Sequence, residues 1–110
     1  MEDCLFCKII KGEIPSNKVW EDDKTFAFYD ISPQAPTHIL VIPKEHIASL
    51  NDLKDTSVMG DLFKAIQGIT QKLNIKEYRT VINTGESAGQ TVFHIHIHIL
   101  AGRPLLWPPG

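Results

Sequence analysis

The chain of 110 residues lacks a long apolar run, an excess of basic residues and a cysteine-rich framework. A membrane-spanning helix needs about 18 or more successive apolar residues, so we expect no such span. The formal net charge of −2 differs from the basic balance of proteins that grip a nucleic-acid polymer. With 43% hydrophobic and 22% charged residues, the composition also excludes disordered and fibrous chains.

Recognisable targeting and linker segments are also missing. Residues 1–7 carry acidic side chains in place of the basic start and apolar stretch of a signal peptide. We therefore expect an intracellular, cytoplasmic protein. In a reducing compartment, Cys4 and Cys7 are more often thiols or metal ligands than a disulfide. Because no repeat or linker interrupts the sequence, residues 1–110 are expected to form one domain.

The order of periodic segments predicts an α+β fold. The predicted elements are a short helix at 4–11, a hairpin of strands at 18–21 and 25–30, a strand at 38–42, a long helix at about 55–73, and strands at 78–83 and 91–100. Pro33 and Pro36 indicate a loop between the hairpin and the third strand. Since the strands mostly follow one another without alternating helices, we expect an antiparallel sheet of five strands.

The long helix has the clearest pattern of these elements. Its apolar stripe consists of Met59, Leu62, Phe63, Ile66, Ile69 and Leu73, at spacings of three and four residues. Asp55 or Thr56 can cap its start, and Asn74 can end it. Gly60 and Gly68 each weaken the helix by roughly 1 kcal/mol relative to alanine. We expect them where the helix packs closely against the sheet.

Residues 93–99 alternate strictly between apolar residues and histidine. Residues two apart in a strand share a face, so His94, His96 and His98 are expected to line one face. The other face, under the long helix, is expected to carry Phe93, Ile95, Ile97 and Ile99. Imidazoles can attack, donate protons or bind metal near neutral pH. The spacing alone leaves open an amphipathic strand, a transition-metal site, or covalent catalysis at phosphorus.

The segment from His94 to Leu100 matches the His-φ-His-φ-His-φ-φ signature of the histidine-triad superfamily, where φ is apolar. The segments 28–38, 41–44, 83–85, 88–92 and 107–110 resemble its nucleotide-binding branch. The resemblance covers nearly the whole chain. It implies a purine nucleotidyl hydrolase, typically a nucleoside phosphoramidase that cleaves a P–N bond in adenosine 5′-phosphoramidates and releases AMP. It also implies a homodimer in which two five-stranded sheets join.

The same resemblance implies roles for the histidines and for the loop before them. His96 would be the nucleophile that carries the nucleotidyl intermediate, and His98 would contact the phosphate or the leaving group. His38 would lie close to the triad. The residues that would cradle the phosphoryl oxygens are Gly89, Gln90 and Thr91. The family usually has serine at the position of Thr91, and threonine retains the hydroxyl.

Other positions resemble those that hold the nucleoside in this family. Asp30 matches the residue that binds the ribose hydroxyls, a role for which a carboxylate is suited. Asn83 matches a residue near the ribose and the phosphate. The positions that match the lining of the base pocket are Phe6, Ile9, Ile14, Phe28 and Ile31. Without the resemblance, these side chains, like His38, would be interpreted as turn or core residues.

Cys4 and Cys7 form a C-x-x-C motif, which suits a redox pair, free thiols or half of a zinc site. The βαβ pattern that usually accompanies a redox pair is absent from the sequence. A tetrahedral zinc site needs two further ligands, and His46 and His94 are the candidates. A subset of histidine-triad proteins resembles this pattern. We therefore expect a structural Zn²⁺ that joins the N-terminus to the histidine segment.

The tail of residues 103–110 is unusually apolar for a free terminus. In related proteins this segment lies near the dimer interface and the active site of the second subunit, so Trp107 is expected to contact substrate or that subunit. The expected partner is a purine mononucleotide, with neither a nucleic-acid polymer nor a membrane. Two other functions stay open: a regulatory nucleotide- or partner-binding module with incidental turnover, and a metal-binding protein that uses the triad itself.

Overall fold

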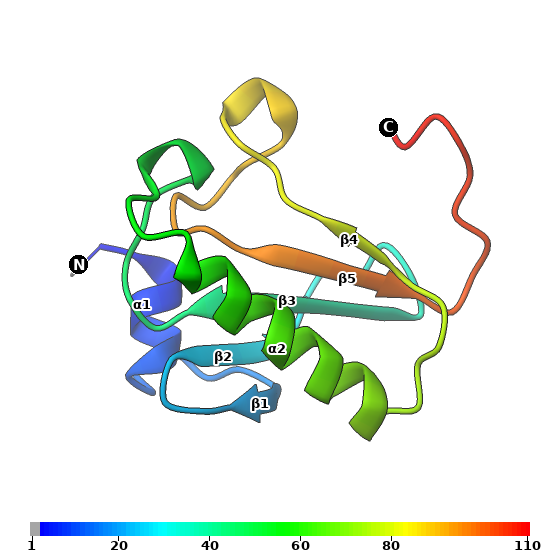
Figure 1. Cartoon of the computed structure of the whole chain (residues 1–110), viewed down its shortest axis with the longest axis horizontal. Coiled ribbons are helices and arrows are strands. Elements are labelled where there is room, and N and C mark those ends of the chain that lie inside the picture. The colour runs from blue at the N-terminus through cyan, green and yellow to red at the C-terminus, as the bar shows by residue number, and fades with distance from the viewer. Residues whose placement is uncertain (1–2) are drawn as a thin grey trace.

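The computed structural model describes residues 3–110, which contain a five-stranded antiparallel sheet and two α-helices (Figure 1). The strands are β1 (Lys18–Glu21), β2 (Thr25–Tyr29), β3 (Thr37–Pro43), β4 (Arg79–Val81) and β5 (Ile97–Ala101), in the spatial order β1-β2-β3-β5-β4. The helices are α1 (Leu5–Ile10) and α2 (Ser57–Lys72), with short 3-10 turns η1 (Leu50–Asp52) and η2 (Glu86–Ala88). The predicted α+β class and antiparallel sheet are confirmed. Residues 1–2 of the predicted domain lie outside the described residues.

β3 lies in the middle of the sheet and separates two parts of the core. Ile39 and Val41 belong to the cluster packed by α2, whereas Leu40 and Ile42 belong to the cluster packed by α1. This alternation follows from the two-residue period of a strand and places His38 on the α1 face. Full burial of each such side chain contributes about 1.5–3 kcal/mol. The α1 face therefore carries both apolar packing and His38, a predicted site residue.

α2 lies within the predicted range, with different contributions from its predicted caps. Asp55 Oδ1 accepts hydrogen bonds from the backbone N–H and the hydroxyl of Ser57, at 3.0 and 2.7 Å, while Thr56 makes no side-chain capping bond. Asn74 follows the helix in the left-handed region, with φ of 55°, as expected of a terminating residue. Between residues 3 and 110, no helix is long and apolar enough to cross a membrane.

The predicted apolar stripe of α2 is correct except at Phe63. Leu62, Ile66 and Ile69 are buried, and Met59 and Leu73 pack against them. Phe63 is 53% exposed. Its position directly after Leu62 rotates it about 100° around the helix axis, away from the sheet.

The prediction of a strand over residues 91–100 is wrong for its first half. β5 begins only at Ile97, because the N–H of Ile95 donates to Ile47 O at 2.7 Å instead of joining the sheet. Ile97 and Ile99 lie under α2 as predicted. Phe93, also predicted there, is 49% exposed. The strand predicted at 78–83 is likewise shortened, to β4.

The two glycines of α2 have different surroundings. A Cβ atom on Gly68 would lie 2.5 Å from Cη2 of Trp20, whereas one on Gly60 would meet nothing within 4 Å. The indole of Trp20 is held by a 2.9 Å hydrogen bond from its Nε1–H to Asp22 Oδ2. The expected close packing against the sheet therefore exists at Gly68 and not at Gly60.

This difference predicts opposite effects for the same substitution. Gly60→Ala should stabilise the protein by about 0.5–1 kcal/mol through helix propensity. Gly68→Ala should destabilise it, because Trp20 must leave its position over the helix. Urea unfolding of both variants would measure the two free energies of unfolding. Equal stabilisation by both would contradict the assigned contact between Trp20 and Gly68.

Candidate functional site

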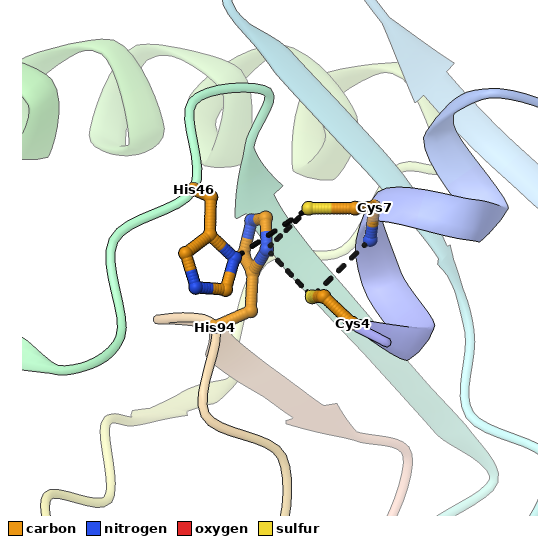
Figure 2. Close-up of side chains that lie close together, drawn as sticks. All are labelled: Cys4, Cys7, His46 and His94. Carbon is orange, nitrogen blue, oxygen red and sulfur yellow. Dashed lines mark hydrogen bonds between the residues drawn. The ribbon is translucent and has the colours of Figure 1, made fainter. Parts of the chain in front are cut away.

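Four predicted metal ligands from three separate segments come together beside the start of α1 (Figure 2). Their ligand atoms, contributed by Cys4, Cys7, His46 and His94, all lie within 4.8 Å of one another. Nδ1 of His94 is 3.3 Å from Cys4 Sγ and 3.6 Å from Cys7 Sγ, and Nδ1 of His46 is 3.5 Å from Cys7 Sγ. The structure thus assembles the predicted set.

Local structure brings the two sulfur atoms together. Cys4 is the N-cap of α1, and its Sγ accepts a hydrogen bond from the backbone N–H of Cys7 at 3.4 Å. A spacing of three residues places both side chains on one side of the first turn. His46 follows β3 and His94 precedes β5, so the cluster joins α1 to two segments beside the sheet.

The donor geometry fits a tetrahedral Zn²⁺. Zinc bonds of about 2.3 Å to sulfur and about 2.0–2.1 Å to nitrogen place tetrahedral S and N ligands about 3.5 Å apart, close to the distances above. His94 Nε2 lies 2.8 Å from the carbonyl of Pro43 and therefore carries the proton, which leaves the lone pair of Nδ1 facing the sulfur atoms. Burial lowers the pKa of His94 to about 4, and the neutral ring is the form that binds metal. Burial raises the pKa of Cys7. A nearby cation would stabilise the ionised form of this thiol.

His96 has one ring nitrogen occupied and one left free to react. Its Nδ1 lies 2.8 Å from the carbonyl oxygen of His94, so this nitrogen carries the proton and donates. Burial lowers the pKa of His96, which favours the neutral ring. In that form Nε2 holds a lone pair. The ring of Phe6 from α1 packs at right angles to the His96 ring, with centroids 5.1 Å apart.

His38 and His98 form a hydrogen-bonded pair with defined donors. The N–H of Gln34 donates to His38 Nδ1 at 3.0 Å, so neutral His38 carries its proton on Nε2. That nitrogen donates to His98 Nδ1 at 2.9 Å, which leaves the proton of His98 on its Nε2. Burial lowers the pKa of both rings, that of His98 to about 4. Among residues 3–110, no partner is found for the buried Nε2 of His98.

Asp30 lies beside this pair. One side-chain oxygen or nitrogen from each of Asp30, His38 and His98 lies within 4.8 Å of the other two. Asp30 Oδ2 is 3.5 Å from His38 Nε2, and its Oδ1 accepts the N–H of Ser32 at 2.8 Å. A metal bound at His38 Nε2 would require a proton on Nδ1, where the N–H of Gln34 already donates. The tautomers therefore favour a hydrogen-bonded relay over a second metal site.

The predicted base-pocket residues divide into buried and exposed members. Phe6, Ile9 and Phe28 form part of the α1-side cluster, and Ile14 packs against it. The rings of Phe6 and Phe28 meet edge to face at 5.5 Å. Ile31 is 98% exposed at the end of the hairpin. An apolar side chain so fully exposed next to Asp30 is available to cover a ligand.

In the predicted phosphate loop, two of the backbone N–H groups expected at the phosphate donate hydrogen bonds within the loop itself. The N–H groups of Gly89 and Gln90 donate within the loop, to Glu86 O and Gly85 O, each at 3.0 Å. Gly85 and Gly89 have φ values of 89° and 103°, which side chains disfavour. The side chain of Gln90 is also fully engaged in the protein. Thr91, which follows directly, is exposed.

Asn83 and Trp107, both predicted to contact the nucleotide, lie in different environments. Asn83 borders the loop, where its Nδ2 donates to Gly89 O at 3.4 Å. Trp107 is 82% exposed in the C-terminal tail, which leaves the sheet after β5 (Figure 1). Arg79 of β4 holds this tail through bonds to Leu105 O and Leu106 O.

Sequence reasoning missed the backbone groups that fix the histidine tautomers. The carbonyls of Pro43 and His94 and the N–H of Gln34 each bond one ring nitrogen. Every residue has such groups, so residue type gave no signal for them. Gln90 was expected at the phosphate, and its side-chain amide is buried and hydrogen-bonded to main-chain atoms of the protein.

Comparison with known proteins agrees with this fold. The HIT domain model matches residues 11–105. The chain is 46% identical to the purine nucleoside phosphoramidase of Escherichia coli K12, over 94% of this chain and 91% of that protein. It is also 46% identical to a 14 kDa zinc-binding protein of Zea mays, over 96% and 87%. A crystal structure of a HIT family hydrolase from Legionella pneumophila Philadelphia 1 superposes with a TM-score of 0.94 at 47% identity, covering 98% of this chain and all of that one. The chain therefore belongs to the HIT family.

Proposed function

We propose that the protein is a purine-nucleotide hydrolase that cleaves the P–N bond of nucleoside 5′-phosphoramidates and releases AMP from the adenosine compounds. The observation that carries the proposal is the pairing of two defined nitrogens on neighbouring histidines. Nε2 of His96 holds a lone pair, and Nε2 of His98 holds a buried proton that has no partner within residues 3–110. The ring centroids are 5.0 Å apart. One group can attack phosphorus while the other serves the departing amine.

The reaction takes place in two displacements. His96 Nε2 attacks the α-phosphorus, a P–N bond to the imidazole forms, and the P–N bond to the amine breaks. An anionic phosphate beside His98 favours an additional proton in the His38–His98 pair, and Nε2 of His98 then gives its proton to the leaving amine. Water then attacks phosphorus, returns a proton to His98 and releases AMP with free His96. Asp30, 3.5 Å from His38, favours positive charge in the His38–His98 pair during these steps.

The nucleotide is held by the elements around these histidines. We assign the ribose hydroxyls to Asp30 and the base to the apolar side chains Phe6, Ile9, Ile14, Phe28 and Ile31. The phosphoryl oxygens are assigned to the loop of Gly89, Gln90 and Thr91, with Asn83 at its border, and Gln90 contributes to this loop through its hydrogen bonds to the protein. Within this loop, Thr91 offers a hydroxyl and a backbone N–H at an exposed position, so it carries most of the direct contact.

We also propose that Cys4, Cys7, His46 and His94 hold one structural Zn²⁺ in the cytoplasm, where the thiols stay reduced. The ion would supply a cross-link between α1 and the segment before β5, with no part in the displacements. His94, whose ring is committed to the metal and to Pro43, orients His96 through its carbonyl group. The relative that is named a zinc-binding protein supports this assignment.

Replacing the nucleophile tests the reaction directly. His96→Ala should reduce kcat on an adenosine 5′-phosphoramidate by at least about 10³-fold, because the covalent route is lost. AMP affinity should change only a few-fold, since base and ribose contacts remain. Steady-state kinetics and calorimetry measure the two effects, and mass spectrometry should detect a nucleotidyl adduct on wild-type His96. Substantial hydrolysis by the variant would remove His96 from its assigned role.

The same assay separates the main alternative. A regulatory nucleotide-binding module would retain AMP tightly and show negligible turnover on a panel of adenosine and guanosine phosphoramidates. That panel also measures the preference between adenine and guanine.

Metal content tests the Cys4 cluster. Protein purified under reducing conditions should contain about one zinc per chain by elemental analysis, and Cys4→Ser with Cys7→Ser should remove it. His38→Ala is the matched control, because His38 lies outside the cluster and should leave zinc content unchanged. Zinc-free wild-type protein, or more than one tightly held metal per chain, would contradict the four-ligand site.

We further propose that two chains form a homodimer through β4 and the C-terminal tail. β4 is an edge strand with one antiparallel neighbour in the described chain, β5. Next to it, Arg79 positions a tail on which Leu106 and Trp107 are both largely exposed. An unpaired edge and exposed apolar side chains favour association.

Light scattering at micromolar concentration should give twice the chain mass of 12.4 kDa. Trp107→Ala should weaken the association, because an aromatic anchor at the interface is lost. A monomer at this concentration would refute the dimer.

A further inference from the structure

Gln90 is a buried polar side chain with a complete set of partners. It is 1% exposed, next to the exposed residues of its own loop. Its Oε1 accepts the N–H of Gly85 at 2.9 Å, and its Nε2 donates to Ala48 O at 2.8 Å and to Val92 O at 3.2 Å. Both amide protons and one oxygen lone pair are used, so the side chain is bound on three sides.

The partners determine the orientation of this amide. The group facing Oε1 is an N–H, and the two groups facing Nε2 are carbonyl oxygens. A flipped amide would oppose donor to donor and acceptor to acceptor. The backbone N–H of Gln90 also donates to Gly85 O at 3.0 Å, so Gly85 and Gln90 exchange two hydrogen bonds. The two ends of the loop are therefore tied together.

The same side chain connects the loop to the segment that carries a metal ligand. Ala48 lies two residues after His46. On the other flank, the N–H of Ile95 donates to Ile47 O at 2.7 Å. Residues 46–48 thus accept hydrogen bonds from Gln90 and from Ile95, which lie on either side of Thr91 in the sequence. The loop, by contrast, is a single 3-10 turn between Gly85 and Gly89, which cannot hold a fixed position by its own packing.

We propose that Gln90 is a positioning residue, which sets the place of Thr91 and its backbone N–H relative to His96 through bonds to Gly85, Ala48 and Val92. This inference rests on the proposed function, because it concerns the same reaction. It also assigns the side chain of Gln90 to the protein interior and away from the phosphate. Donors at the phosphoryl group accelerate the reaction only when they are held where charge develops.

Two variants of Gln90 test this role. Gln90→Met keeps the length of the side chain and removes all three bonds, and Gln90→Glu removes the two donated by Nε2. Both should lower kcat by about 10–100-fold, because misplaced donors lose transition-state stabilisation. KM and the Kd of adenosine should stay within about threefold, since base and ribose contact other elements. Gln71→Met, an exposed position on α2, is the matched control and should retain wild-type kinetics.

A purely structural role would lower thermal stability and leave kcat per folded molecule unchanged. That result, or wild-type kcat in a folded Gln90 variant, would overturn the proposal. An equal loss of adenosine and AMP affinity would also overturn it, because it would indicate a general collapse of the pocket.

Amide hydrogen exchange of the free wild-type protein tests the hydrogen bonds of the Gln90 side chain without reference to catalysis. The N–H of Gly85 should be protected at least tenfold over an unstructured peptide, although its residue lies in a loop. Unprotected Gly85 would overturn the inference even if both variants failed to fold. If Gly85 is protected but the protein has no phosphoramidase activity, the proposed function is wrong, whereas the hydrogen bonds of the Gln90 side chain are confirmed.

Discussion

The hydrogen bond from His96 Nδ1 to the carbonyl of His94 is the interaction on which the site depends. It decides which nitrogen of His96 keeps a lone pair, and it joins the histidine segment to the cysteine cluster within two residues. His94 is in turn fixed by Pro43 and by the two sulfur atoms. Buried main-chain atoms therefore fix the orientation of the His96 ring. The position of the lone pair on His96 depends on these hydrogen bonds as much as on the residue type.

The division of the core by β3 separates the packing under α2 from the histidines beside α1. The α2 face is packed with aliphatic side chains such as Ile39 and Val41. The α1 face combines aromatic rings with histidines, and Phe6 contacts both Phe28 and His96. The α2 cluster and the candidate site thus lie on opposite faces of one sheet.

The sequence sufficed for the elements whose pattern repeats over many residues. The stripe of α2 and the hairpin up to Tyr29 were predictable because period and turn chemistry agree there. The segment before Ile97 was not, since strict alternation predicts which side chains share a face but not whether a ladder exists. The four candidate metal ligands could be selected from residue types and from resemblance, and the structure brings them together. The tautomers and the role of Gln90 were not predictable, because they depend on main-chain atoms that any residue could supply.

The cluster that holds Cys4 also has a consequence for how the chain reaches its final state. Cys4 and His94 are separated by 90 positions, so the fourth ligand emerges only when nearly the whole chain has been synthesised. Closing so long a loop has a high entropy cost before native contacts compensate for it. Metal capture by all four donors would consequently be a late event, and a chain ending before His94 would retain at most three of them.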